Sequence, residues 1–150
     1  METFPIAPAA TRALWFIPVL LVAVLVPVVV LVGSSLAGSR TARFNVLPGG
    51  LELRGDWYGR TIPAEQIRGQ AARRVDFAAE PALAPKIRTM GTGFPGYQAG
   101  WFRLRNGEKA LLYLTDRSRA VYVPTTAGYS LLLSPADPDA FLSAIRAMAR

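Results

Sequence analysis

The longest uninterrupted apolar stretch of the chain covers residues 13–32 (ALWFIPVLLVAVLVPVVVLV) and contains no charged side chain. As an α-helix these residues would rise about 30 Å, which matches the hydrocarbon core of a bilayer. Pro18 and Pro27 each lack a backbone donor, a loss that membrane helices tolerate better than soluble helices do. The pattern predicts one transmembrane anchor over residues 13–32, preceded by an N-terminal tail at residues 1–12.

The residues that flank the apolar stretch indicate whether it is cleaved and which side of the membrane the following domain occupies. Residues 35–37 (SLA) are small enough for signal-peptidase cleavage, but the stretch exceeds the roughly 7–15 residues of a usual signal core, so an uncleaved anchor is favoured. Arg40 and Arg43 follow the stretch and only Arg12 precedes it, which favours a cytoplasmic domain of a single-pass cell-membrane protein. The small, polar residues 33–40 (GSSLAGSR) predict a short flexible linker.

Residues 41–150 are the predicted globular domain, where turn signals recur about every ten residues, as in a domain built from sheets. Residues 48–50 (PGG) and Asn106-Gly107 predict hairpin turns, because Gly adopts positive φ without strain. The predicted strands cover residues 43–47, 51–54, 57–62, 72–77, 100–105, 109–115, 120–123 and 129–133, with one helical turn at 63–67.

A C-terminal helix is predicted from Asp137, which can cap it, with Pro138 at the first helical position and Asp139 complementing the helix dipole. An apolar stripe follows at helical spacing, formed by Phe141, Leu142, Ile145 and Met148. The predicted fold class is therefore mainly β, a β-rich α+β domain. Its antiparallel strands form a small barrel or sandwich that the C-terminal amphipathic helix caps, and one transmembrane helix precedes it.

The amino-acid composition limits the catalytic and metal-binding chemistry that this chain can carry. The chain has 150 residues and neither Cys nor His, which excludes disulfides, thiolate nucleophiles and the metal sites that these side chains build. Asp137 and Asp139 are accounted for by the helix start, and no other acidic pair is distinguished as a catalytic pair. The aromatic residues, Trp57 among them, are expected in the core and at its rim. No catalytic residue, metal site or cofactor is predicted.

Several segments in order resemble one family of domains. They are residues 57–60 (WYGR), 81–86 (PALAPK), 88–97 (RTMGTGFPGY), 100–102 (GWF), 109–116 (KALLYLTD), 121–125 (VYVPT), 128–133 (GYSLLL) and the helix start at Asp137. Together they resemble the bacterial PH (pleckstrin-homology-like) domain family, with Met90 where that family favours Asn. The resemblance implies strongly bent antiparallel sheets in a partly open barrel, a C-terminal helix that plugs one end, and membrane-associated proteins without catalytic residues to carry over.

Residues 91–96 (GTGFPG) match the spacing G-x-G-x-x-G, which dinucleotide-binding folds place between a buried strand and a helix. The preceding residues make a poor buried strand and Pro95 blocks a following helix, so a nucleotide site is not favoured. The segment is expected to form a tight loop that brings Trp101 into the sheet. Its glycines Gly91, Gly93 and Gly96 could alternatively present successive N–H groups as an anion nest.

The formal net charge is +7, and 16 of the 17 basic residues follow the apolar stretch. Anionic leaflets attract exposed Lys and Arg at roughly 1 kcal/mol each. The side chains expected to contact anionic lipid are Arg73, Arg74, Arg117 and Arg119. Nucleic acid would also attract them, but the predicted membrane tether and the lack of a helix-based reading motif disfavour that partner.

These features predict a membrane-anchored PH-like binding or scaffolding module, and not an enzyme, which contacts anionic lipid headgroups or a membrane protein. The effective concentration that a tether provides would populate even weak contacts. The alternative is an extracytoplasmic structural or assembly protein that binds a partner chain, and a hydrolase ranks a distant third. Neither the ligand nor the oligomeric state can be read from the residues.

Overall fold

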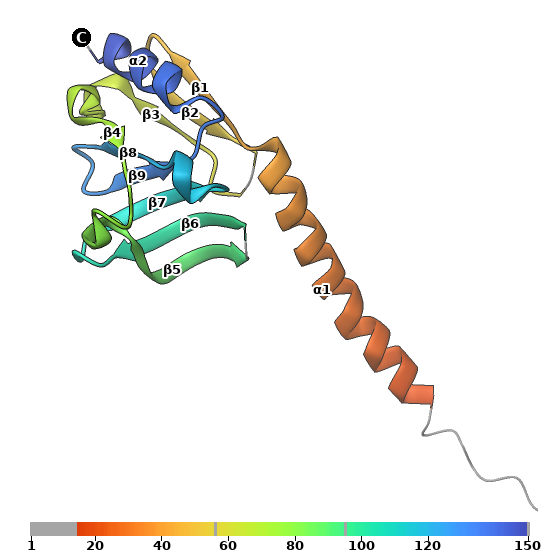
Figure 1. Ribbon diagram of the computed structural model, residues 1–150. Helices are drawn as coiled ribbons and strands as arrows, with labels where there is room; N and C mark the ends of the chain where they lie inside the picture. The colour runs from red at the N-terminus through yellow and green to blue at the C-terminus, as the bar shows by residue number, and fades with distance from the viewer. Residues whose placement is uncertain (1–14, 56, 95, 150) are drawn as a thin grey trace, which may run out of the picture. The chain divides into compact units, whose positions relative to one another are not determined.

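The computed structural model describes residues 15–55, 57–94 and 96–149, so the expected N-terminal tail at residues 1–12 lies outside the described residues. The chain divides into two compact units, Met1–Ser34 and Ser35–Arg150 (Figure 1). The first unit contains most of one apolar helix, and the second contains all the strands.

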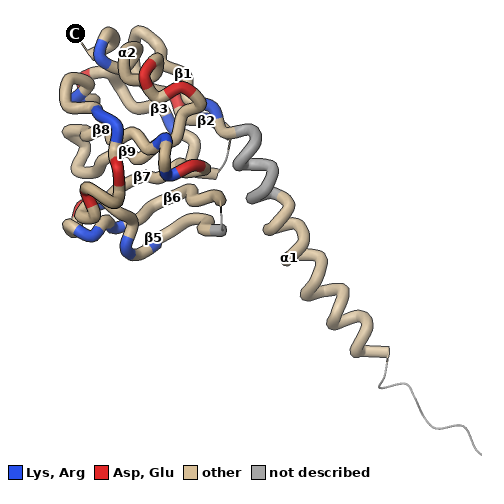
Figure 2. The backbone as a smooth tube through the Cα atoms, in the orientation of Figure 1, with Lys and Arg blue, Asp and Glu red and all other residues tan. Residues whose placement is uncertain are grey.

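The helix α1 (Phe16–Thr41) confirms the apolar helix that the sequence predicts. Within the described residues, its segment Phe16–Gly33 is the one helix long and apolar enough to cross a membrane, and none of that segment is buried in the structure. Pro18 lies in the first turn, where backbone N–H groups have no intrahelical acceptor, so only Pro27 removes an internal hydrogen bond. In Figure 2 the part of α1 that is not grey carries no Lys, Arg, Asp or Glu.

The flexible linker predicted at residues 33–40 is wrong, because α1 continues through these residues to Thr41. Adding a residue to an existing helix fixes one residue for one new hydrogen bond, so propagation is far easier than nucleation. Leu, Ala and Arg in this stretch are good helix formers and outweigh the two glycines, each of which costs about 1 kcal/mol relative to Ala.

Nine strands are found among the described residues, in two sheets of order β1-β2-β3 and β4-β8-β9-β7-β6-β5. The first sheet contains β1 (Arg43–Leu47), β2 (Gly50–Arg54) and β3 (Arg60–Pro63). The second contains β4 (Arg73–Arg74), β5 (Pro85–Phe94), β6 (Tyr97–Leu104), β7 (Lys109–Leu114), β8 (Val121–Pro124) and β9 (Ser130–Leu133). Short 3₁₀ turns lie between them: η2 (Ala64–Gln66), η3 (Gly69–Ala71), η4 (Pro81–Leu83) and η5 (Arg117–Arg119).

Most strands lie where the sequence predicts them, with three differences. The third strand begins at Arg60 and not at residue 57, and the strand predicted at 72–77 shortens to Arg73–Arg74. The strand β5 was not predicted at all. All pairs are antiparallel except β7 and β9, which run parallel because β9 inserts between β7 and β8.

The core forms on both faces of the six-stranded sheet. One cluster joins this sheet to the three-stranded sheet and to α2 (Pro138–Met148), and its members include Leu51, Ile62, Leu131 and Ile145. A smaller cluster covers the opposite face with residues between β4 and β5, such as Val75 and Leu83. The bent sheets and the packed C-terminal helix confirm the PH-like, mainly β fold class, and the two sheets do not close into a barrel.

The second unit holds all its strand partners and both core clusters within itself. Its helix α2 is capped as the sequence predicts, since the Asp137 carboxylate accepts hydrogen bonds from the N–H groups of Asp139 and Ala140. No strand or buried side chain of the clusters comes from residues 15–34, so the domain carries what it needs to fold without the apolar helix.

Candidate functional site

The start of β1 is the point where the chain enters the domain, and sheet register decides which residues lie beside it. Arg43 in β1 pairs with Arg54 at the end of β2. The connection from Arg54 to β3 therefore lies at the same end of the sheet, and it carries Trp57. We call Ala42, Arg43, Arg54, Trp57 and residues 115–119 the entry end of the domain.

A groove of about 560 Å³ opens at the entry end, between β1 and the chain beyond β7 and β9. Phe44 and Phe141 form its apolar base, with ring centroids 6.1 Å apart. Its rim is polar and carries two cations and one anion. The lining residues are Ala42, Arg43, Phe44, Asn45, Thr115, Asp116, Arg119, Ser134, Pro135, Ala136 and Phe141.

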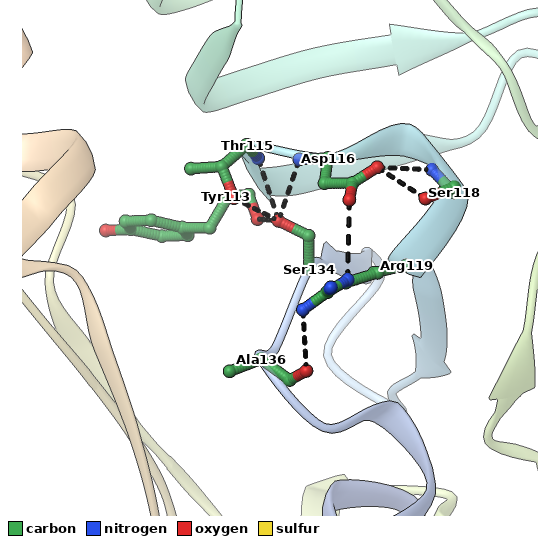
Figure 3. Close-up of polar contacts among 7 residues, drawn as sticks. All are labelled: Tyr113, Thr115, Asp116, Ser118, Arg119, Ser134 and Ala136. Carbon is green, nitrogen blue, oxygen red and sulfur yellow. Dashed lines mark hydrogen bonds and ion pairs between the residues drawn. The ribbon is translucent and has the colours of Figure 1, made fainter.

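Ser134 holds one wall of this groove in place (Figure 3). The parallel pairing of β7 with β9 puts Tyr113 beside Leu133, so the residues that follow both strands meet. The Ser134 hydroxyl accepts a hydrogen bond from the Thr115 N–H at 2.8 Å and lies 2.9 Å from the Thr115 hydroxyl. It also lies 3.3 Å from the Tyr113 carbonyl oxygen, which it can donate to. The wall is thus built by tertiary pairing of segments 20 residues apart.

Asp116 organises the turn η5, as Figure 3 shows. Its carboxylate accepts hydrogen bonds from the Ser118 N–H at 2.9 Å and the Ser118 hydroxyl at 2.6 Å. These bonds, and secondarily the charge of Arg119, hold the pKa of Asp116 below its ordinary value. Arg119 lies 3.4 Å from the same carboxylate and donates to the Ala136 carbonyl at 2.9 Å. Arg119 is therefore fixed in position, and Asp116 offsets much of its charge.

Two further arginines at the entry end carry charge without an acidic partner among the described residues. Arg43 is exposed on the groove rim. Arg117 is exposed on η5, with its guanidinium 5.9 Å from the ring centroid of Phe77. Arg54, in contrast, forms an ion pair with Glu52 at 2.7 Å.

The sequence grouped Arg73 and Arg74 with Arg117 and Arg119 as lipid contacts. The pairing of Arg74 with Val121 brings β4 close to η5, so the four do lie in one region. However, Arg73 forms an ion pair with Glu80, and that bond raises the pKa of Arg73. Arg74 forms one with Asp139 at 2.9 Å. Both sites are exposed, but each positive charge already has a negative partner.

The tight loop predicted for the glycine motif is wrong. Gly91 and Gly93 lie within β5, where Gly91 pairs with Gly100 and Gly93 pairs with Gln98 of β6. A Cβ on Gly91 would lie 2.3 Å from the Ala99 carbonyl oxygen, so glycine is needed there for close strand approach. Only Gly96 lies in a turn, with φ of +84°. The backbone of the first two glycines belongs to a ladder and not to a nest of free N–H groups.

The predicted location of Trp57 is also wrong. It was expected in the core or at its rim, yet its side chain is 92% exposed. Trp101, by contrast, packs against the core, with Tyr129 at 5.0 Å and the cations of Arg60 and Lys109 at 4.7 and 4.2 Å from its ring. Composition and spacing do not distinguish these two indoles, because burial is decided by how strands pair.

The described residues contain no group of three or more Asp or Glu side chains that could hold a metal ion. A two-sheet β domain closed by a packed helix, with a basic groove at one end, has the architecture of a small binding module. The model of the bacterial PH domain family matches residues 42–149, so the chain belongs to that family. No curated protein and no solved structure matches the chain. PH-like domains are generally binding modules without catalytic activity.

Proposed function

We propose that this protein is a single-pass membrane protein whose PH-like domain binds anionic lipid headgroups of its own membrane through the entry end. The domain faces the cytoplasm and acts as a binding module without a reaction of its own. The observation that carries the proposal is the groove rimmed by Arg43 and Arg119, with Arg117 on the adjoining turn, at the point where the chain enters the domain.

Charge and connectivity support this assignment. Nine residues lie between Gly33, the end of the apolar segment, and Arg43. Even fully extended, that stretch reaches at most about 35 Å, so the entry end stays close to the headgroups. Arg43 and Arg117 have no acidic partner among the described residues, and each is worth roughly 1 kcal/mol near an anionic surface. The hydrogen-bonded Thr115 and Ser134 hydroxyls and the Asn45 amide supply further polar groups on the rim.

The test is co-sedimentation of the isolated domain, residues 42–149, with lipid vesicles. We expect binding to vesicles that contain phosphatidylglycerol and none to pure phosphatidylcholine. Binding should weaken as the salt concentration rises to 0.15 M, where the Debye length is about 8 Å. The double substitution Arg43→Ala with Arg117→Ala should reduce affinity about thirtyfold, because two charges contribute about 2 kcal/mol.

Arg105→Ala is the matched control, since Arg105 is exposed at the β6–β7 turn at the other end of the domain. It removes the same charge and should leave affinity nearly unchanged. Arg119→Ala should have a smaller effect than Arg117→Ala because Asp116 already offsets Arg119. Equal binding to neutral and anionic vesicles, or equal losses from Arg105→Ala and Arg117→Ala, would refute a specific role for the entry end.

A second candidate, an extracytoplasmic assembly protein, draws on the edge strand β5. Its solvent-facing edge carries Ile87 and Met90 with exposed fractions of 54% and 63%, and a partner chain could pair there. Register shifts after Pro85 and after Arg88 interrupt this edge, and such irregularities disfavour strand addition. Reporter fusions at the C-terminus separate the two candidates, because they place the domain on opposite sides of the membrane.

A further inference from the structure

The most exposed large apolar side chain of the domain is Trp57, at 92%. The exposed fractions of the other large apolar side chains on the described surface of the domain are smaller: 47% for Leu47, 54% for Ile87 and 63% for Met90. An indole buries 150–250 Å² when it packs, so full exposure forgoes a large hydrophobic gain. Trp101, in contrast, is partly buried against the core, so the domain does pack an indole where the strands allow it. Trp is enriched at protein interfaces and at membrane interfaces, where one end of the side chain is apolar and the other meets water.

The location of Trp57 identifies the surface that it meets. Trp57 follows Arg54, which pairs with Arg43, so it lies at the entry end. The helix α1 continues without a break to Thr41, two residues before Arg43. From Gly33 to Arg43 a helix would rise only about 15 Å. A bilayer of about 40–45 Å includes an interfacial layer several ångströms deep on each side of its 30 Å core. The chain between the apolar segment and the entry end is therefore short enough for the entry end to reach that layer.

The chemistry of Trp57 fits the same layer. Indoles concentrate at membrane–water interfaces, where the apolar ring enters the acyl boundary and the N–H keeps polar partners. Arg43 of β1 and Arg117 of η5, at the same end, supply positive charge next to the phosphate layer. The aromatic ring and the arginines thus offer complementary contacts to one surface.

We propose that Trp57 inserts its indole into the headgroup–acyl boundary of the membrane that holds α1, and so fixes the entry end of the domain against the bilayer. The inference rests on the proposed anchoring of α1, but it does not require anionic lipid. Insertion is driven by apolar area and therefore persists in neutral membranes, whereas the arginine contacts of the proposed function do not.

The test uses the full chain in nanodiscs of phosphatidylcholine whose acyl chains are brominated near the headgroup, since bromine quenches an indole only at contact. Trp15→Phe removes the Trp that directly precedes α1 and leaves Trp57 and Trp101. We expect the emission of this variant to be lower in brominated than in unbrominated nanodiscs. The additional substitution Trp57→Phe should abolish that difference, because Trp101 packs within the domain.

A relocated indole supplies the matched control. Thr126 is exposed in the turn between β8 and β9, at the end of β8 away from η5. Thr126→Trp in the variant that lacks Trp15 and Trp57 should show no quenching. Quenching of Trp57 but not of the Trp at 126 supports insertion. Equal emission from Trp57 in brominated and unbrominated nanodiscs, with neutral lipid and with added phosphatidylglycerol, overturns it.

The two proposals fail in different ways. A chain that does not stay in the nanodisc refutes the anchoring on which both rest. A chain that stays but shows no quenching of Trp57 refutes insertion, and the vesicle result for the isolated domain still decides headgroup binding. Quenching that needs phosphatidylglycerol would refute the claim that insertion is independent of the arginine contacts.

Discussion

The pairing of Gly100 with Gly91 offers a demanding test of the fold. Gly100 in β6 has φ of +114°, and Gly91 opposite it in β5 has φ of +146°. A Cβ on Gly100 would lie 2.5 Å from the Met90 carbonyl oxygen and 2.6 Å from the Gly91 Cα. Both contacts are backbone atoms that no side-chain rotation can move, so the two strands must separate to admit Gly100→Ala.

The expected cost has two parts. Holding a non-glycine residue at this positive φ costs about 1–3 kcal/mol. Forcing an extra methyl into a closely packed position adds about 1–3 kcal/mol. We therefore expect Gly100→Ala to lower the free energy of unfolding by about 2–6 kcal/mol. Gly107 isolates the first part, because its φ is +89° and nothing lies within 4 Å of its Cβ position. Gly107→Ala should cost only about 1–2 kcal/mol.

The measurement is urea unfolding of residues 42–149, followed by the emission of Trp101, which neighbours Gly100. A larger shift of the midpoint for Gly100→Ala than for Gly107→Ala, at unchanged slope, is the expected result. Equal costs would show that the close approach of β5 and β6 does not stabilise the sheet. A cost below about 1 kcal/mol for Gly100→Ala would refute the strain argument as well.

Three further outcomes are expected. Phe141→Ala should cost about 3–5 kcal/mol in urea unfolding, because Phe141 is buried against Phe44, whereas the exposed Ser143→Ala should cost less than about 0.5. Burial, and secondarily the Glu108 carboxylate, raise the pKa of Tyr122 above its ordinary 10.0. The contribution of Tyr122 to the free energy of unfolding is thus fully present below pH 10.0 and is lost at higher pH. The stability of the Tyr122→Phe variant should therefore fall less steeply above pH 10.0 than that of the unsubstituted protein. An identical alkaline slope would contradict this. Residues 13–32 should keep the mature chain in the membrane through an alkaline carbonate wash, and an intact mass that begins at Gly38 would show cleavage instead.

Local signals in the sequence were reliable wherever one segment determines its own conformation. The Asp137 cap and the Pro138 helix start are as predicted, because the capping bonds join residues two and three positions apart. The Asn106-Gly107 turn joins β6 to β7 as predicted, since φ of +89° at Gly107 is a local requirement. The apolar stretch at residues 13–32 likewise identified a helix by its length and composition alone.

Predictions failed where partners distant in the sequence decide the conformation. Residues 91–96 look like a loop because glycine has low strand propensity, but residues 91–94 belong to β5, which pairs with β6 through contacts such as Gly91 with Gly100. The ion pairs of Arg73 with Glu80 and of Arg74 with Asp139 were also missed, and the lipid contact of these two arginines stays a prediction that the pairs disfavour. Neither partner could be inferred from spacing.

The same distinction between local sequence signals and tertiary pairing applies to the whole domain and its candidate site. The sequence by itself determined a long apolar helix, a basic mainly β domain and a capped C-terminal helix, because hydrophobic periodicity and turn residues act over a few positions. The bacterial PH family was indicated separately, by the resemblance of several motifs in order. Only the tertiary structure decided that Arg43 joins Arg119 on one groove, that Ser134 holds its wall, and that Trp57 lies exposed at the same end. The reason is physical: strand pairing brings together residues that lie far apart in the chain, and no short-range pattern records which ones will meet.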